Sequence, residues 1–155
     1  MEHMLPDAPD KLAVAIWEAA RHVSALRDAL ADWHMNPPAS LEQVESDPES
    51  RRLADQLLFR FLKLQDTLGE RLVPATLAHL LEPDADRPMV DKLNRLERLG
   101  FIRLDDWLQW RDLRNRLSHE YPEQADLRWA TLLAAVDAAA AMVALYERWH
   151  GRLAK

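Results

Sequence analysis

Cysteine is absent from the 155 residues of this chain. A disulfide framework, a catalytic thiolate and a zinc site built on sulfur are therefore excluded. The absence fits a reducing compartment. The N-terminal stretch MEHMLPDAPDK is acidic and interrupted by proline, which is unlike an export signal. No apolar run approaches the roughly 18 residues of a membrane span. We therefore expect a cytoplasmic protein with no membrane anchor.

Glycine is also scarce, with only three residues, and strongly β-forming patterns do not recur. Alanine and leucine dominate the 48% of residues that are hydrophobic, and 30% of the chain is charged. This composition is typical of a soluble helical protein. The length suits one domain with a single core, so we expect residues 1–155 to form one all-α domain.

A strong positive charge is missing too, because the formal net charge is −6. This argues against a protein that coats nucleic acid with its whole surface. The charge is uneven, since residues 87–119 hold eight Lys or Arg against five Asp or Glu, a local +3, and the rest carries −9. Such a basic region is either a local site for phosphate or a chance fluctuation between helices.

Apolar residues recur at alternating spacings of three and four, which predicts long helices packed nearly parallel or antiparallel. Proline and glycine mark where these helices begin, bend or end. The expected fold is an up-and-down bundle of four to five helices. The predicted helices cover residues 10–35, 48–81 with a bend near 71–74, 88–99 with Gly100 as a C-terminal cap, and 105–119 capped by Asp105 or Asp106. The last predicted helix begins between residues 122 and 126 and extends to 149.

The segment 34–49 is expected to connect the first two helices. Its Ser40-Leu41-Glu42-Gln43 has the spacing of a capping box and predicts one short helical turn within the connection.

Trp107–Pro122, WLQWRDLRNRLSHEYP, concentrates charged and aromatic residues as no other segment does. On an ideal helix Arg114 falls inside the apolar arc formed by the tryptophans and leucines of this segment. A guanidinium there must be paired, stacked on an indole or open to a cleft, because an unpaired buried charge is too costly. The alternatives are a structural arginine bonded to a neighbouring carboxylate and an arginine that binds a ligand.

His119 lies five residues after Arg114, about 140° away around an ideal helix. The two side chains would share a face only if the helix ends between them or a second subunit brings them together. His119 suits either a helix C-terminal cap or proton transfer near neutral pH. Tyr121 stands before Pro122, where helical dihedrals are disfavoured, and is either a packed ring or an exposed nucleophile.

Other chemistries are not indicated. The remaining histidines form no i, i+4 pair of metal ligands, and we expect neither a metal nor another cofactor. A Gly-rich phosphate loop and a Gly-x-Ser-x-Gly elbow are both missing. The six tryptophans are interpreted as core and interface residues.

The segment Arg114–Tyr121 reads R-N-x-x-x-H-x-Y and resembles the signature of the HEPN superfamily, specifically the HepT-like toxins. The stretches FRFLKLQDTLGERLVPATL and DKLNRLERLGFI are also similar to HepT-like sequences. The resemblance implies a HEPN-like helical bundle that forms a homodimer, with two motif segments lining one cleft.

The resemblance further implies a metal-independent ribonuclease that cleaves RNA through the 2′-hydroxyl. His119 would act as general acid or base, Arg114 would stabilise the phosphate charge, and Asn115 would orient or bind the substrate. Arg111 and Arg116 are added as contacts to the RNA backbone because of their charge and proximity.

The same resemblance implies a partner, an MntA-like nucleotidyltransferase antitoxin that silences the toxin by adenylylation of Tyr121. Bulky anionic nucleotides beside Arg114 and His119 would block phosphate binding. Two alternatives stay open at this point. One is a non-catalytic protein that binds a nucleotide or a nucleotidyltransferase, and the other is a structural bundle whose motif only caps and packs.

Overall fold

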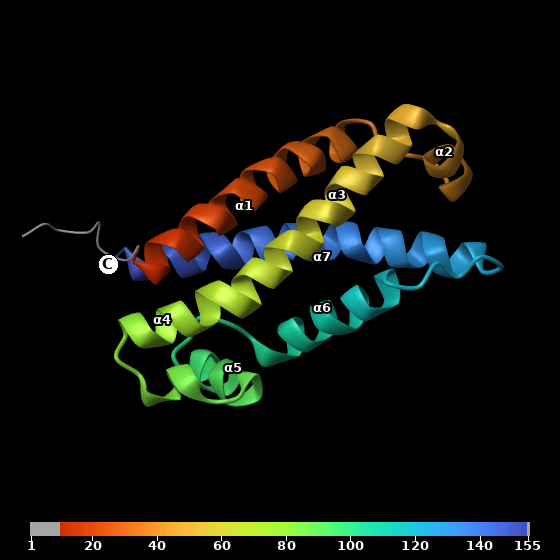
Figure 1. Cartoon of the computed structure of the whole chain (residues 1–155). Helices are drawn as coiled ribbons and strands as arrows, with labels where there is room; N and C mark the ends of the chain where they lie inside the picture. The colour runs from red at the N-terminus through yellow and green to blue at the C-terminus, as the bar shows by residue number, and fades with distance from the viewer. Residues whose placement is uncertain (1–9, 155) are drawn as a thin grey trace, which may run out of the picture.

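The computed structural model describes residues 10–154, and all regular structure in this part of the chain is helical. Residues 1–9, which include the stretch expected to lack an export signal, lie outside the described residues. Figure 1 shows the arrangement. The elements are α1 (Lys11–Met35), α2 (Leu41–Ser46), α3 (Pro48–Thr67), a π-helical turn (Leu68–Leu72), α4 (Val73–His79), a 3-10 turn (Pro83–Asp86), α5 (Met89–Arg98), α6 (Leu104–Leu117) and α7 (Ala125–Leu153).

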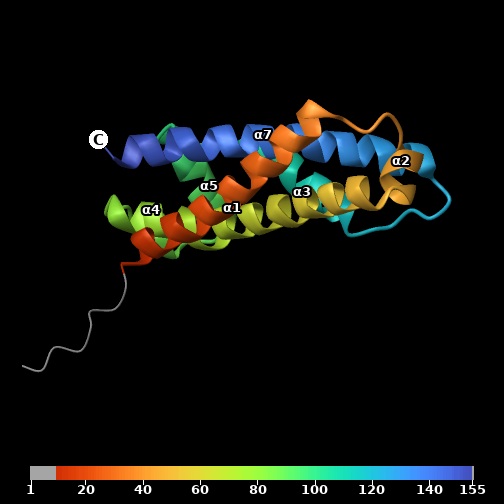
Figure 2. The same ribbon diagram turned by 90° about the horizontal axis from the view of Figure 1, so that it is seen from above.

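The long helices run alternately in opposite directions, as an up-and-down bundle requires. In Figure 1, α1 and α6 run toward the end that carries α2, whereas α3 with α4 and α7 run away from it. Figure 2 shows α3 and α7 side by side, with α1 crossing over them from the side of α3 to the side of α7. The all-α prediction and the helical bundle are confirmed. The prediction of four to five helices is too low, because residues 10–154 also form the short helices α2 and α4.

The N-terminal half follows the predicted signals closely. Asp10 caps α1 by accepting a hydrogen bond from the backbone N–H of Leu12 at 2.9 Å. The short turn predicted in the connection is α2, where the Ser40 hydroxyl accepts from the Gln43 N–H at 3.2 Å. The Gln43 side chain reaches back to the N–H of Ala39 at 2.9 Å, which completes a reciprocal cap shifted by one residue.

The bend predicted near residues 71–74 is a π-helical turn that keeps the chain helical from α3 into α4. Its wider hydrogen bonds include that from the Val73 N–H to the Leu68 carbonyl, and they accommodate Pro74, which has no N–H to donate. Gly69 lies in this turn against Trp107 of α6. A Cβ at Gly69 would lie 3.2 Å from the indole, so glycine permits this close approach.

The predicted cap of α5 is confirmed, but that of α6 is wrong. Gly100 follows α5 in the left-handed region with φ of 84°. Neither Asp105 nor Asp106 caps α6, because both lie inside its first turn. The carboxylate of Glu97 instead accepts from the Leu104 N–H at 2.7 Å. α6 ends at Leu117, two residues before the predicted end.

The core is one cluster of side chains to which each of the helices α1 to α7 contributes, and four of the six tryptophans belong to it. Trp149 of α7 is fully buried, and its indole N–H donates to the Thr76 hydroxyl of α4 at 3.0 Å. Trp33, Trp107 and Trp110 are also buried. Trp17 is exposed and lies outside the core, so for this residue only the interface part of the prediction stays open.

α7 corrects the statement that no apolar run reaches the length of a membrane span. Within residues 10–154 it is the one helix long and apolar enough to cross a membrane, with a mean hydropathy of 1.6 over its most apolar 18-residue window. Of that window, 56% is buried inside the protein. α7 packs against α1, α3 and α6, as the central helix of a bundle does.

Candidate functional site

The motif segment lies where α6 ends and the chain turns toward α7. Ser118 is the C-terminal cap residue, and its hydroxyl donates to the carbonyl of Asn115 at 2.6 Å. The His119 N–H donates to the Arg116 carbonyl at 3.1 Å and closes a last turn beyond the helix. His119 and Glu120 are therefore exposed just past the helix end. The histidine does not occupy the cap position itself.

Tyr121 has a backbone conformation that is rare for its residue type. Its φ is 49°, in the left-handed region, rather than the extended conformation expected before Pro122. The Arg128 guanidinium donates to the Tyr121 carbonyl at 2.9 Å and to the Pro122 carbonyl at 3.2 Å. These bonds tie the turn to the first part of α7. The rings of His119 and Tyr121 lie 5.8 Å apart at 59°.

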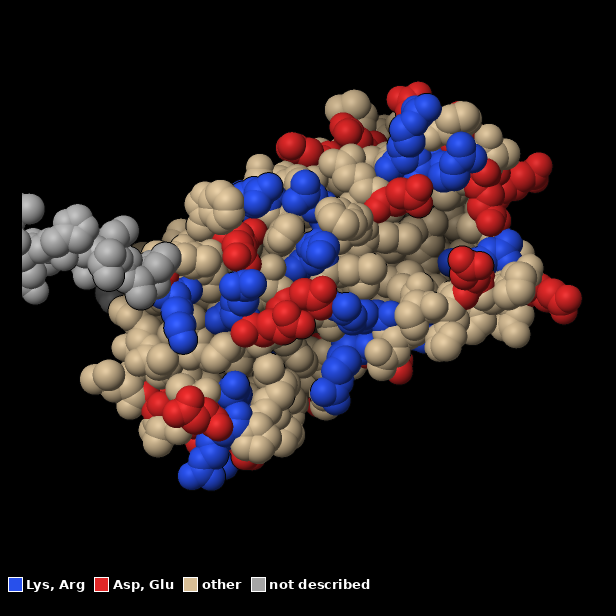
Figure 3. Space-filling view, in the orientation of Figure 1, with Lys and Arg blue, Asp and Glu red and all other residues tan. Residues whose placement is uncertain are grey.

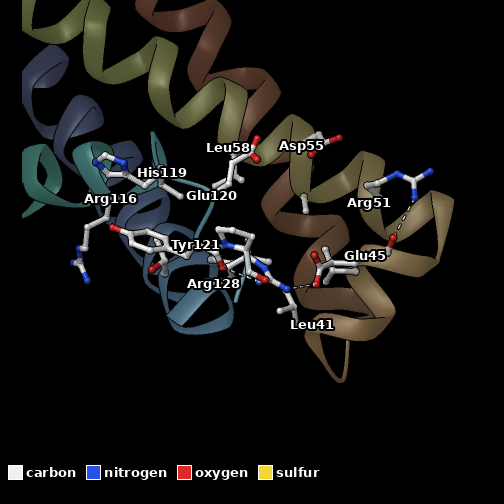
Figure 4. A pocket seen from close by; sticks show the side chains of 16 residues that line it. Leu41, Glu45, Arg51, Asp55, Leu58, Arg116, His119, Glu120, Tyr121 and Arg128 are labelled. Atoms are coloured by element: carbon white, nitrogen blue, oxygen red, sulfur yellow. Dashed lines mark hydrogen bonds and ion pairs between the residues drawn. The ribbon is translucent and has the colours of Figure 1, made fainter. Parts of the chain in front are cut away.

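A cavity of about 650 Å³ lies beside this turn, between α2, α3, the end of α6 and the start of α7. Figure 4 shows its lining, with His119 and Tyr121 at one side and residues of α2 and α3 at the other. The floor is apolar and includes Val44, Leu58 and Leu132. The charged residues around it have both signs and are Arg51, Arg116 and Arg128 together with Glu45, Asp55 and Glu120.

Arg128 and Glu45 join the two sides of this cavity. The Arg128 Nη2 lies 2.9 Å from a carboxylate oxygen of Glu45 on α2. Arg128 therefore contacts both α2 and the motif turn, and its charge is partly neutralised there. The Arg51 guanidinium donates to the Glu45 carbonyl at 3.2 Å, which also holds α2 against α3.

Arg114 points to a different place. Its guanidinium forms an ion pair with the carboxylate of Asp66 on α3, and Nη1 lies 3.5 Å from the Leu62 carbonyl. The Arg114 side chain is 38% exposed and that of Asp66 is 33% exposed. Arg114 does not line the cavity beside His119. The pairing with a carboxylate is one of the alternatives that the sequence left open for this residue.

The other predicted site residues are distributed around the end of α6. Arg111 and Asn115 are exposed. Arg116 is half-buried and lines the cavity, with Nε 3.4 Å from a carboxylate oxygen of Asp112 one turn earlier. Within one chain, the structure brings together His119, Tyr121 and Arg116 but leaves Arg114 on the side that faces α3.

Three residues of this region, Asp66, Arg128 and Glu45, were not predicted from the sequence. Asp66 could have been sought, because a guanidinium in an apolar arc needs a carboxylate on a neighbouring helix. Arg128 and Glu45 gave no such signal, since both belong to polar stretches whose spatial neighbours depend on the fold. Among residues 10–154 there is no group of three or more His, Asp or Glu side chains placed to hold a metal ion.

Comparison with known proteins adds no relative. No protein-family model matches the sequence, no curated protein shows significant similarity to it, and no solved structure shows significant similarity to its fold.

Proposed function

We propose that this chain is a metal-independent endoribonuclease toxin of a bacterial toxin–antitoxin pair, with a HEPN-like fold and a site shared between two copies of the chain. The observation that carries the proposal is the position of the R-N-x-x-x-H-x-Y segment. Its histidine and tyrosine lie together at an exposed helix end beside a cavity of about 650 Å³.

The separation of Arg114 and His119 supports the proposed homodimer. In one chain Arg114 faces α3 and His119 lies beyond the helix end, so one copy does not offer both to a single phosphate. Two motif segments packed across a twofold axis would offer two arginines and two histidines to one cleft. This arrangement is isologous, as most homodimer interfaces are.

The proposed reaction uses the RNA as its own nucleophile. One His119 imidazole takes the proton of the 2′-hydroxyl while the 2′-oxygen attacks phosphorus. The bond from phosphorus to the 5′-oxygen breaks, and a protonated His119 gives that oxygen a proton. The products are a 2′,3′-cyclic phosphate and a 5′-hydroxyl end. Arg114 stabilises the charge that develops on the phosphate oxygens.

The supporting residues have smaller roles. Asn115 is exposed one residue after Arg114 and would orient or bind the substrate. Arg111 and Arg116 would contact the RNA backbone. Arg116 is the better placed of these two basic residues because it lines the cavity.

The proposed regulator is an MntA-like nucleotidyltransferase antitoxin that adenylylates Tyr121. The tyrosine lies in a turn between two helices, next to the His119 ring. A nucleotide attached there would put negative charge and bulk beside the histidine and exclude an RNA phosphate.

A second candidate is a non-catalytic protein that binds a nucleotide or a nucleotidyltransferase. The observation in its favour is the ion pair of Arg114 with Asp66, which already neutralises the arginine assigned to the phosphate. The cavity also contains as many carboxylates as guanidinium groups among its charged residues.

The deciding experiment measures RNA cleavage by the purified protein with excess EDTA. We expect the wild type to cleave single-stranded RNA, and His119→Ala and Arg114→Ala each to lose at least about 100-fold in rate. Removal of a general acid or base has an effect of this size, and so has removal of a group that stabilises charge in the transition state. Glu120→Gln is the matched control because this exposed neighbour of His119 has no assigned role. The 5′-hydroxyl and cyclic phosphate ends identify the reaction.

Cleavage that survives in either alanine variant would remove the catalytic role of that residue. A wild-type protein that never cleaves RNA, yet forms a tight complex with a nucleotidyltransferase, would replace the ribonuclease with the binding protein. The mass of Tyr121 peptides after incubation with that enzyme and ATP tests adenylylation separately.

A further inference from the structure

Two large aromatic side chains are exposed on the face formed by α1 and α3. Trp17 of α1 is 60% exposed and Phe59 of α3 is 52% exposed. Both helices lie at the front of the molecule in Figure 1, so the space-filling view in Figure 3 shows this face. Leaving an indole and a phenyl ring in water forgoes the stabilisation that burial would give. Exposed rings of this kind therefore merit a functional explanation.

Basic side chains lie against both rings. The Arg21 guanidinium is 4.8 Å from the centroid of the Trp17 ring. The Arg60 guanidinium and the Lys63 ammonium are 5.5 and 5.7 Å from the centroid of Phe59. Each of the two aromatic residues still keeps more than half of its surface exposed, so a flat ligand can reach it.

The two groups form one patch because α1 and α3 contact each other between them. The Arg60 Nη1 lies 2.9 Å from Nδ1 of His22, the residue after Arg21. We call Trp17, Arg21, His22, Phe59, Arg60 and Lys63 the aromatic–basic patch. Figure 3 shows Lys and Arg side chains over α1 and α3 on this side of the molecule.

The patch is a local positive region on an acidic protein. Burial lowers the pKa of His22 most, and the positive charges of Arg60, Arg21 and Lys63 lower it further. Glu18, the acidic residue that opposes this effect, already pairs with Arg71 at 3.0 Å. Three permanent cations therefore remain near the rings to meet an anionic ligand.

We propose that the aromatic–basic patch binds single-stranded RNA, with bases stacked on Trp17 and Phe59 and phosphates bound by Arg21, Arg60 and Lys63. Proteins that bind single strands without sequence preference combine a basic track with aromatic platforms, because every base has a stacking face and every nucleotide a phosphate. The choice of RNA rests on the proposed ribonuclease function. The chemistry of the patch itself comes from residues outside the motif.

The position of the patch supports this occupant. Lys63 follows Leu62, whose carbonyl lies 3.5 Å from Nη1 of Arg114. A strand that runs along the outer side of α3 from Phe59 past Lys63 therefore reaches the arginine proposed to hold the scissile phosphate. A second copy of the chain fits this face less well, because two identical basic patches would repel each other across a twofold axis.

The competing explanation is local. Trp17 with Arg21 and Phe59 with Lys63 are i, i+4 pairs, which stabilise a helix without any ligand. The two explanations differ in what alanine substitution does. Loss of a local pair would change stability slightly and leave RNA affinity unchanged, whereas loss of a stacking platform would reduce affinity and leave cleavage chemistry intact.

The test measures binding of a fluorescein-labelled oligouridylate by anisotropy, in full-length protein that carries His119→Ala to prevent cleavage. We expect Trp17→Ala and Phe59→Ala each to weaken binding by about tenfold or more, the size of one lost base–aromatic stack. Trp17→Phe should recover most of the affinity. Val90→Ala is the control, since this exposed α5 residue lies outside the patch and should bind like the parent.

Salt dependence provides a second readout that protein stability does not affect. Lys63→Gln and Arg60→Gln should each reduce the slope of log affinity against log salt by about 0.7, the value for one phosphate contact on a single strand. Replacement of the probe by a double-stranded RNA should remove the effect of Trp17→Ala, because paired bases cannot stack on an exposed ring.

Equal oligouridylate affinities for the parent, Trp17→Ala and Phe59→Ala would overturn the patch as an RNA site. That result would leave the ribonuclease proposal intact if the wild type still cleaves RNA. Conversely, weakened binding by both alanine variants in a protein that never cleaves RNA would support the patch and overturn the proposed catalysis. The two proposals therefore fail by different measurements.

Discussion

Arg114 of α6 forms an ion pair with Asp66 of α3, and both side chains remain about one third exposed. The ion pair explains how a guanidinium lies within the apolar arc of α6 without an unpaired charge. It also means that an RNA phosphate must compete with Asp66 for Arg114. The carboxylate is thus a candidate determinant of how tightly the proposed site binds its substrate.

Asp66→Asn should therefore tighten RNA binding and leave the catalytic groups in place. A partly exposed ion pair contributes up to about 1 kcal/mol, so we expect a gain of up to roughly fivefold in affinity. The measurement is oligouridylate anisotropy in the His119→Ala background, followed by cleavage rates with His119 restored. Glu147→Gln is the matched control, because Glu147 pairs with Arg27, to which no contact with RNA is assigned.

A different outcome would reassign Asp66. If Asp66→Asn slowed cleavage as much as Arg114→Ala does, the carboxylate would be a positioning residue that keeps the guanidinium in its productive orientation. Equal affinity and rate in Asp66→Asn and the wild type would indicate that Arg114 does not meet the phosphate.

The hydrogen bonds between Arg128 and the motif turn lead to a second prediction. Arg128→Ala removes hydrogen bonds to the carbonyls of Tyr121 and Pro122, and the turn then holds Tyr121 in its left-handed conformation less firmly. We expect faster hydrogen exchange of the backbone amides in residues 119–124 and a lower cleavage rate, with little change in overall stability. Mass spectrometry of exchanged peptides measures the first effect.

Glu45→Gln separates the two functions of Arg128. This substitution removes the ion pair with α2 but retains the bonds from Arg128 to the turn. Exchange in residues 119–124 should therefore stay near the wild-type rate. Faster exchange in Glu45→Gln to the same extent as in Arg128→Ala would show that the contact with α2, and not the carbonyl bonds, orders the turn.

The helical bundle was largely predictable from the sequence, because its signals are local. Asp10, Ser40 and Gly100 mark helix ends through hydrogen bonds or dihedral angles within a few residues, and the structure uses all three. The cap of α6 was not predictable in this way. Glu97 reaches Leu104 across the turn after α5, and Asp105 and Asp106 were the nearer candidates.

The candidate site was predictable in its residues but not in its geometry. The motif gave Arg114, His119 and Tyr121, and the angle between the first two on a helix already indicated separate faces. The pairing of Arg114 with Asp66 and of Arg128 with Glu45 joins residues 48 and 83 positions apart in the chain. Such contacts depend on how the helices pack, and no local pattern encodes them.

The buried hydrogen bond between Trp149 and Thr76 supports a third prediction, on stability. Thr76→Val keeps the shape of the side chain but leaves the buried indole N–H without its acceptor. An unsatisfied buried donor costs about 1–3 kcal/mol, and we expect the free energy of unfolding to fall by that amount. Urea denaturation measures the change.

Thr76→Ser tests whether the lost hydrogen bond causes the expected fall in the free energy of unfolding. Serine retains the hydroxyl and loses only a methyl group, which costs about 1 kcal/mol in a core. If Thr76→Val proved as stable as the wild type, relaxation around Trp149 or a water would have to satisfy the indole.

His22 makes stability depend on pH. Its pKa is lowered from the ordinary value of 6.5, first by burial and then by Arg60, Arg21 and Lys63. The unfolded chain therefore binds the proton more readily than the folded one, and stability rises with pH in this window. The loss of stability is absent above the pKa that His22 has in the unfolded chain. It grows as the pH falls through 6.5 toward the lower pKa that His22 has in the folded protein.

His22→Gln should flatten this dependence. Urea denaturation between about pH 8 and pH 5 covers the range in which histidine changes charge. We expect the wild type to lose more stability than His22→Gln over that range. His150→Gln is the control, an exposed histidine on α7. Equal slopes for the wild type and His22→Gln would indicate that neither burial nor the neighbouring cations lower the pKa of His22 on folding.

The ends of α4 and α5 share one C-terminal motif with different residues at its left-handed position. After α4, Leu81 has φ of 58°, and the N–H groups of Leu81 and Glu82 bond to the carbonyls of Ala78 and Leu77. After α5, Gly100 has φ of 84°, and Gly100 and Phe101 make the equivalent pair of bonds. Only glycine adopts this conformation without a steric cost.

Leu81→Gly should therefore stabilise the protein. Leu81 is 90% exposed, so the substitution removes little packing. The substitution removes a strain of about 1–2 kcal/mol that the left-handed conformation imposes on leucine. The greater conformational freedom of glycine in the unfolded chain offsets about 0.5–1 kcal/mol of this gain. We expect a net gain of about 0.5–1 kcal/mol and a rise in Tm of roughly 1–4 °C, measured by calorimetry.

Gly100→Ala provides the reverse substitution and makes the comparison decisive. A Cβ at Gly100 would lie 3.5 Å from the Arg152 guanidinium, an ordinary contact, so any loss of stability reports backbone strain rather than a clash. We expect this variant to lose about 1 kcal/mol. If Leu81→Gly lowered the Tm while Gly100→Ala also lowered it, the Leu81 side chain would contribute contacts that outweigh its strain, and an exposed leucine at that position would itself need a partner.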